Sequence, residues 1–77
     1  MSGNKGMNRL GEKLRTLRQR HNLTVRQLGD ILKVNNSYIT QIETGRKTPS
    51  LKLAIKMADF FNIDVNQLIR DELELDE

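Results

Sequence analysis

The apolar residues of this chain recur at helical spacing, and no stretch alternates apolar and polar residues as a half-buried strand would. The pattern therefore predicts an all-α fold. Five short helices are expected, over residues 8–21, 25–32, 36–44, 51–61 and 65–73. With 77 residues the chain suffices for one compact domain, and a large substrate cleft is not expected.

Residues that start or stop helices bound these segments. Two positions have the spacing of a capping box, in which the capping residue is followed three positions later by Glu or Gln. Gly45 is expected to end the third helix in a left-handed conformation. The expected N-caps are Thr24 (with Gln27), Asn35, Ser50 and Asp64 (with Gln67), and the expected stops also include Asn22 and Asn62.

No long linker, repeat or low-complexity tract divides the chain. We expect residues 1–7 to be a disordered lead or a cloning remnant, residues 8–73 to form the helical domain, and residues 74–77 to be a frayed acidic tail. No apolar run reaches the length of a membrane span, and the start lacks a hydrophobic signal segment. A cytoplasmic protein that does not enter the membrane is expected.

The composition argues against catalysis. Cysteine is absent and histidine occurs once, at His21, which excludes disulfides, thiol nucleophiles, Cys/His zinc sites and a His-based triad. His21 lies on the apolar stripe of the first expected helix, where a structural role is expected. The sequence therefore predicts no catalytic residue, no metal site and no cofactor.

Charge is divided unevenly along the chain. Residues 1–56 hold 12 basic and 3 acidic residues, a net charge of +9, whereas residues 57–77 hold 1 basic and 7 acidic residues, a net charge of −6. A basic segment of this kind indicates a polyanionic partner. Nucleic acid and an anionic membrane surface both fit the charge alone.

The third expected helix has an outward face that is polar but uncharged, opposite Ile39 and Ile42. Because solvent-facing helix surfaces usually carry Lys and Glu, this composition favours a binding surface over a solvated face. Amide and hydroxyl groups suit hydrogen bonds to DNA base edges, and nearby cations suit phosphate contacts. The face comprises Ser37, Thr40, Gln41 and Thr44, with Asn36 on its shoulder, and the flanking cations are Arg26, Lys33, Arg46 and Lys47.

Glu43 stands in the last turn of the same helix, where a carboxylate opposes the helix dipole. Its position predicts a specific cationic partner. Arg18 lies beside the apolar stripe of the first helix. We therefore expect an ion pair between Arg18 and Glu43.

With these features the chain resembles the phage-repressor and Cro-like helix-turn-helix proteins, also called the XRE family. The resemblance covers residues 10–68 and is densest over residues 23–50, LTVRQLGDILKVNNSYITQIETGRKTPS. It implies a lambda-repressor-like five-helix domain whose second and third helices form the helix-turn-helix, with the third in the major groove of DNA. It also implies a bacterial or phage-encoded regulator that joins the nucleoid when bound.

The resemblance assigns roles to residues that match the family pattern. It implies base reading by Asn36, Ser37, Thr40 and Gln41, and it matches Arg18 and Glu43 to a buried ion pair. It also implies phosphate contacts, which together with the flanking cations give the set Thr24, Arg26, Lys33, Asn35, Tyr38, Thr44, Arg46 and Lys47.

Three positions depart from the family pattern. Val25 replaces the usual Gln at the start of the second helix, which removes a phosphate-contacting or supporting side chain. Gly29 replaces the usual Ala and keeps the residue small where helices cross. Lys33 replaces the usual Gly, at a cost of order 1 kcal/mol for a left-handed conformation.

The fourth expected helix carries two apolar faces. We expect the face of Leu51, Ala54, Ile55, Ala58 and Phe61 to pack in the core, and the stripe of Leu53, Met57 and Phe60 to be exposed. An exposed apolar stripe marks an interface. The expected occupant is a second copy of the chain, in a dimer built through this stripe and the fifth helix. The alternatives are Leu73 and Leu75 folding back from the same chain, or a different protein such as a toxin.

Taken together, the residues and the resemblance predict sequence-specific binding of double-stranded DNA by a homodimeric transcriptional repressor. Two protomers would place their third helices about 34 Å apart, which requires an inverted-repeat operator. Two alternatives remain open. One is an antitoxin that represses its own operon and binds a toxin, and the other is a protein-interaction adaptor that does not bind DNA.

Overall fold

A computed structural model describes residues 8–76, in which the regular elements are five α-helices. The expected all-α fold is confirmed. The helices are α1 (Leu10–Arg20), α2 (Val25–Leu32), α3 (Asn36–Glu43), α4 (Leu51–Phe61) and α5 (Val65–Ile69). The expectation for residues 1–7 lies outside the described residues.

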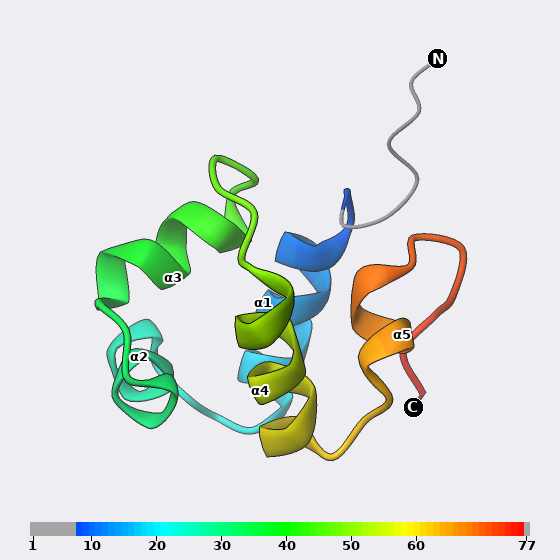
Figure 1. Cartoon of the computed structure of the whole chain (residues 1–77). Coiled ribbons are helices and arrows are strands. Elements are labelled where there is room, and N and C mark those ends of the chain that lie inside the picture. The colour runs from blue at the N-terminus through cyan, green and yellow to red at the C-terminus, as the bar shows by residue number, and fades with distance from the viewer. Residues whose placement is uncertain (1–7, 77) are drawn as a thin grey trace.

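The helices are arranged around α1 and α4. α1 packs against α3 and α5, while α4 packs against α2 and α5. As a result, α2 and α3 lie on one side of α1 and α4, and α5 lies on the other (Figure 1). The buried core therefore draws side chains from all five helices.

Side-chain caps define where four of the helices begin. Thr24 and Asp64 form complete capping boxes, and the side chains of Asn35 and Ser50 accept hydrogen bonds from backbone amides of α3 and α4. The expected caps are thus confirmed. After each of the first four helices the chain turns at a residue in the left-handed conformation. These residues are Asn22, Lys33, Gly45 and Asn62, with φ of 55°, 63°, 83° and 59°.

The sequence-based assignment of faces on α4 was correct for Ala54, Ala58, Phe61 and the exposed Phe60, and wrong for four other residues. Leu53 and Met57 are buried, with exposed fractions of 9% and 0%, whereas Leu51 and Ile55, which were expected in the core, are 55% and 42% exposed. At about 100° per residue, the apolar side chains of α4 form a single arc of roughly 220° rather than two faces. The middle of the arc is buried and both borders are exposed. Phe60 lies at one border and is 40% exposed.

α5 is shorter than expected, because it ends at Ile69 rather than near residue 73. The buried ammonium of Lys13 donates hydrogen bonds to the carbonyl oxygens of Gln67, Arg70 and Leu73 at 2.7, 2.8 and 2.6 Å. A continued helix would have bonded the Gln67 carbonyl to the amide of residue 71. Lys13 therefore terminates α5 by taking that carbonyl.

The segment after α5 lies along α1, and residues 74–76, where we expected a frayed acidic tail, contact α1 and the residue before it. Asp71 caps the start of α1 by accepting from the amides of Asn8 and Arg9 at 3.3 and 2.8 Å. The Arg9 guanidinium donates to both carboxylate oxygens of Glu74 at 2.9 and 3.0 Å. Leu75 is half-buried against the core, while Leu73 remains 37% exposed.

Candidate nucleic-acid interface

α2 and α3 form a compact two-helix unit joined by a tight turn. Lys33 adopts the left-handed conformation that the turn requires, and the Val34 amide donates to the Gly29 carbonyl at 2.9 Å. A Cβ atom on Gly29 would stand 2.8 Å from the Val34 carbonyl oxygen. Both residues therefore serve the close crossing of α2 and α3. Val25 is half-buried against the core.

α3 is fixed to α1 through Glu43, whose side chain is only 2% exposed. Its two carboxylate oxygens accept from Nε and Nη2 of Arg18 at 2.6 and 3.1 Å, which gives the bidentate geometry of a strong ion pair. The hydrogen bonds to Glu43 raise the pKa of Arg18. Arg18 also donates to the Leu23 carbonyl at 2.9 Å. The expected ion pair is therefore present, and it joins α1, α3 and the segment before α2.

The backbones of α1 and α3 also approach each other closely where the Arg18–Glu43 ion pair joins the two helices. A Cβ atom on Gly11, in the first turn of α1, would overlap the carbonyl oxygen of Ile42 and stand 2.8 Å from that of Glu43. Only glycine allows α1 to lie this near the last turn of α3. The end of α3 is thus fixed by backbone contact as well as by charge.

The outward face of α3 presents side chains that differ in their free hydrogen-bonding groups. Asn36 is exposed and Gln41 is half-buried, and neither side-chain amide has a hydrogen-bond partner within residues 8–76. By contrast, the hydroxyl of Ser37 donates to Asn35 Oδ1 at 2.8 Å, and that of Thr40 donates to the Asn36 carbonyl at 3.5 Å. Asn36 and Gln41 therefore retain both donor and acceptor groups for a ligand, and Ser37 and Thr40 retain acceptors.

The four cations expected to meet phosphate lie on segments next to α3. Arg26 projects from α2, Lys33 from the turn, and Arg46 and Lys47 from the loop between α3 and α4, and all four are exposed. Among residues 8–76, none of them forms an ion pair with a carboxylate. Their charge is therefore available to an external anion.

The uncharged residues expected to contact phosphate differ from one another in exposure and in whether their side chains already form hydrogen bonds. Thr24 and Asn35 are exposed, but their side-chain oxygens already cap α2 and α3. Thr44 donates its hydroxyl to the Thr40 carbonyl at 2.9 Å. Tyr38 is half-buried and packs against the core. The Asn35 amide nitrogen is thus the clearest uncharged donor of this group.

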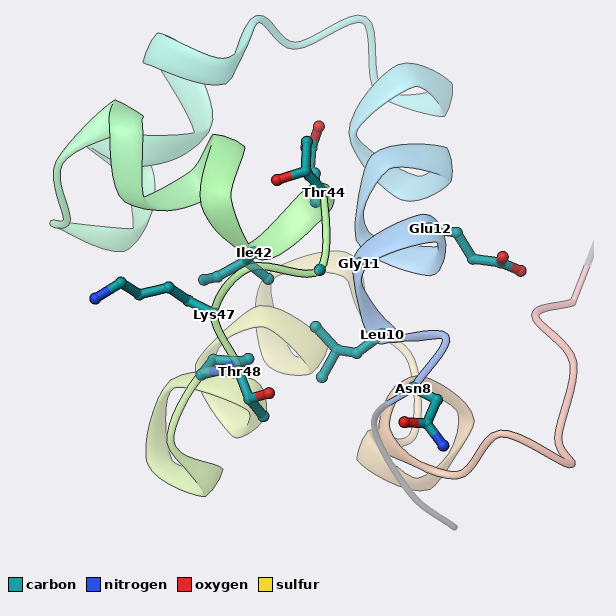
Figure 2. Close-up of a pocket in the computed structure, with 11 residues that line it drawn as sticks. Asn8, Leu10, Gly11, Glu12, Ile42, Thr44, Lys47 and Thr48 are labelled. Atoms are coloured by element: carbon teal, nitrogen blue, oxygen red, sulfur yellow. The ribbon is translucent and has the colours of Figure 1, made fainter. Parts of the chain in front are cut away.

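A hollow of about 450 Å³ lies between the first turn of α1 and the loop that follows α3. Figure 2 shows Leu10 and Ile42 within it, while Lys47 and Glu12 point away in opposite directions. No group of three or more His, Cys, Asp or Glu residues that could hold a metal ion occurs in residues 8–76. In the same range, no helix is long and apolar enough to cross a membrane.

His21 lies at the C-terminal cap of α1, more exposed than its position on the apolar stripe predicted. Its Nδ1 is 3.0 Å from the Leu17 carbonyl oxygen, and its ring meets Phe61 edge-on with centroids 4.9 Å apart. Through these contacts the His21 ring packs at the end of α1 against α4, which fits the structural role expected for it.

Sequence reasoning missed two residues that hold this interface in place, Arg15 and Gly11, and a third, Lys13, that holds α5. Arg15 donates to Glu43 at 3.3 Å, Gly11 permits the close approach of α1 to α3, and Lys13 holds α5. Arg15 precedes Arg18 by three positions, which places both on one face of α1 and was a usable signal. The roles of Gly11 and Lys13 depend on contacts with segments that are distant along the chain. Local sequence patterns do not show such contacts.

Known proteins with similar sequences and structures contain the same helix-turn-helix arrangement. A helix-turn-helix family model, HTH_3, matches residues 14–68. An uncharacterized HTH-type transcriptional regulator of Methanocaldococcus jannaschii is 43% identical over 56 residues, which cover 73% of this chain and 85% of that protein. The restriction-modification controller protein C.AhdI of Aeromonas hydrophila superposes with a TM-score of 0.72 at 27% identity, covering 80% of this chain and 94% of the other.

A further solved structure supports the fold alone. The biofilm-formation regulator SinR of Bacillus subtilis, solved in complex with DNA, superposes with a TM-score of 0.71 at 22% identity. The match covers 77% of this chain and 95% of the other.

Proposed function

This chain belongs to the helix-turn-helix family of DNA-binding transcriptional regulators, and we propose that it acts as a homodimeric repressor that reads an inverted-repeat operator. The observation that carries the proposal is the outward face of α3. Its free amides at Asn36 and Gln41 are bordered by cations that have no carboxylate partner within residues 8–76.

In this proposal α3 enters the major groove, and its side chains discriminate between bases. Asn and Gln side chains pair bidentately with adenine, so the free amides of Asn36 and Gln41 supply most of the discrimination. Ser37 and Thr40 supply acceptors, which suit a cytosine or adenine amino group.

Phosphate contacts supply affinity and register. Arg26, Lys33, Arg46 and Lys47 provide charge, and Thr24, Asn35, Tyr38 and Thr44 provide neutral contacts near the backbone. The rigid link from Arg18 to Glu43 holds α3 in place, so little ordering is needed on binding.

Repression requires no further chemistry. A dimer that covers two half-sites about 34 Å apart excludes other proteins from the same DNA. Symmetry then requires the operator to be an inverted repeat.

Replacing Gln41 by Ala tests base reading. We expect binding to the preferred operator to weaken by roughly 1–3 kcal/mol, with relaxed preference at one base position in each half-site. Operators are first selected from a random duplex pool, and variants are then compared by fluorescence anisotropy over all single-base changes. Gln19→Ala on the exposed surface of α1 is the matched control and should leave both quantities unchanged.

Replacing Lys47 by Ala separates affinity from specificity. This variant should weaken binding to all duplexes alike and reduce the salt dependence by about one unit of slope per protomer. Selection of no common sequence from the pool contradicts sequence-specific binding. If Gln41→Ala behaves like Lys47→Ala, base reading by Gln41 is wrong.

A further inference from the structure

The outer surface of α4 carries an ordered row of exposed side chains. Lys52 and Asp59 stand two turns apart on the side of α4 that faces away from the core, and Leu51 and Ile55 stand one turn apart along the exposed border of its apolar arc. Figure 1 shows α4 in front of α1, with no other helix drawn in front of α4. We call these four residues the α4 face.

The charges of the α4 face have no partner within the described part of the chain. Neither Lys52 nor Asp59 forms a hydrogen bond or ion pair with any residue of 8–76. They are seven positions apart and therefore share one side of the helix. Lys56, the neighbouring cation, is turned toward α2, where its Nζ donates to the Leu32 carbonyl at 2.8 Å.

This arrangement is complementary to itself. When two α4 helices lie antiparallel about a twofold axis midway between residues 52 and 59, Lys52 of each copy faces Asp59 of the other. The same axis passes beside Ile55, so the two Ile55 side chains meet, with Leu51 extending the apolar contact along the same edge. Each interaction occurs twice, as an isologous interface requires.

We propose that the α4 face is the dimer contact of this protein and that its partner is a second copy of the same chain. The proposal rests on the homodimer of the proposed function and names the surface that builds it. One helix face is smaller than the 20–30 residues per side of stable interfaces. The dimer is therefore concentration-dependent, with a dissociation constant at or above roughly micromolar.

Charge reversal tests the pairing. Lys52→Glu places a carboxylate opposite Asp59, and Asp59→Lys places an ammonium opposite Lys52, so each variant alone should dimerise about tenfold more weakly, because two exposed charge pairs change sign. Both substitutions match the helix dipole, with the anion near the start and the cation near the end of α4. The helix is therefore retained, and circular dichroism checks this.

The decisive measurement is the mixture of the two variants. In the mixed dimer, the carboxylate introduced by Lys52→Glu in one copy meets the ammonium introduced by Asp59→Lys in the other. The second pair keeps the original Lys52 and Asp59, so both pairs are attractive and dimerisation should return. The double variant K52E/D59K should dimerise like the original protein. Sedimentation equilibrium without DNA, from about 1 µM to about 1 mM, gives the dissociation constants, and Gln19→Glu on α1 is the charge-changing control.

A covalent test uses the absence of cysteine from the chain. Ile55→Cys should form a disulfide-linked dimer under mild oxidation. Lys52→Cys and Asp59→Cys should link to each other when mixed and much less to themselves. If the unmodified protein dimerises but neither charge reversal nor these thiols respond, the α4 face is wrong while the homodimer stands. A monomer at every concentration, with or without operator DNA, overturns both.

Discussion

At the scale of single residues, Glu43 is the most constrained charge of the interface. Its carboxylate lies at the C-terminal end of α3, where the helix dipole disfavours it, and it is removed from water. The bidentate contact with Arg18 and the further contact with Arg15 offset these costs. A buried charge of this kind is costly to leave without its partner, even where the intact pair contributes little net stability.

Glu43→Gln should therefore lower the free energy of unfolding by about 3 kcal/mol, because it leaves the mostly buried Arg18 guanidinium without a counter-charge. Glu12→Gln is the matched control, since Glu12 pairs with Arg9 at 2.9 Å but is 63% exposed. An exposed pair is worth less than about 1 kcal/mol. Urea unfolding at neutral pH measures both changes, and equal losses would contradict the special role of Glu43.

At the scale of elements, the sequence predicted what is set locally. The caps at Thr24, Asn35, Ser50 and Asp64 depend on side chains that lie next to the amides they bind, and these were all read correctly. The burial of α4 was misread because its apolar residues cover more of the helix surface than the core contacts. The sequence alone does not show which part of that arc faces the core. The end of α5 was misread because Lys13, more than 50 positions away, donates to the carbonyls of Gln67 and Arg70 at that end.

Lys13 is expected to hold α5 and the segment after it as one unit. Burial lowers the pKa of Lys13, so its charge is tolerated only because three carbonyl oxygens surround it. Lys13→Met keeps a chain of similar length but leaves those carbonyls without a donor, at a cost of about 1–3 kcal/mol. Amide exchange of residues 70–76 should accelerate more than that of α2 and α3.

Arg20→Met serves as the control for this change. Arg20 also contacts the C-terminal segment, through one hydrogen bond of 2.6 Å to the Asp76 carbonyl, but that contact is exposed. The variant should lose less than about 1 kcal/mol. If Lys13→Met and Arg20→Met change exchange in residues 70–76 to the same extent, Lys13 is not the residue that holds this segment.

At the scale of the whole molecule, two groups of basic residues differ in what they contact. Arg9, Lys13 and Arg20, at the start of α1 and along it, contact the acidic segment after α5. By contrast, Arg26, Lys33, Arg46 and Lys47 form no ion pairs within residues 8–76. The uneven charge of the two halves was visible in the sequence, but the pairing was not, because it joins residues that are distant along the chain.

This division predicts how DNA affinity depends on salt. Arg26, Lys33, Arg46 and Lys47 give four phosphate contacts per protomer and eight per dimer, so the logarithm of the association constant should fall with the logarithm of salt concentration with a slope of about −7. Arg20→Ala should leave the slope unchanged, because Arg20 already contacts the C-terminal segment. Lys33→Ala should make it shallower by about two units per dimer. Operator titrations at several salt concentrations measure the slopes, and a change with Arg20→Ala as large as that with Lys33→Ala would show that α1 also meets phosphate.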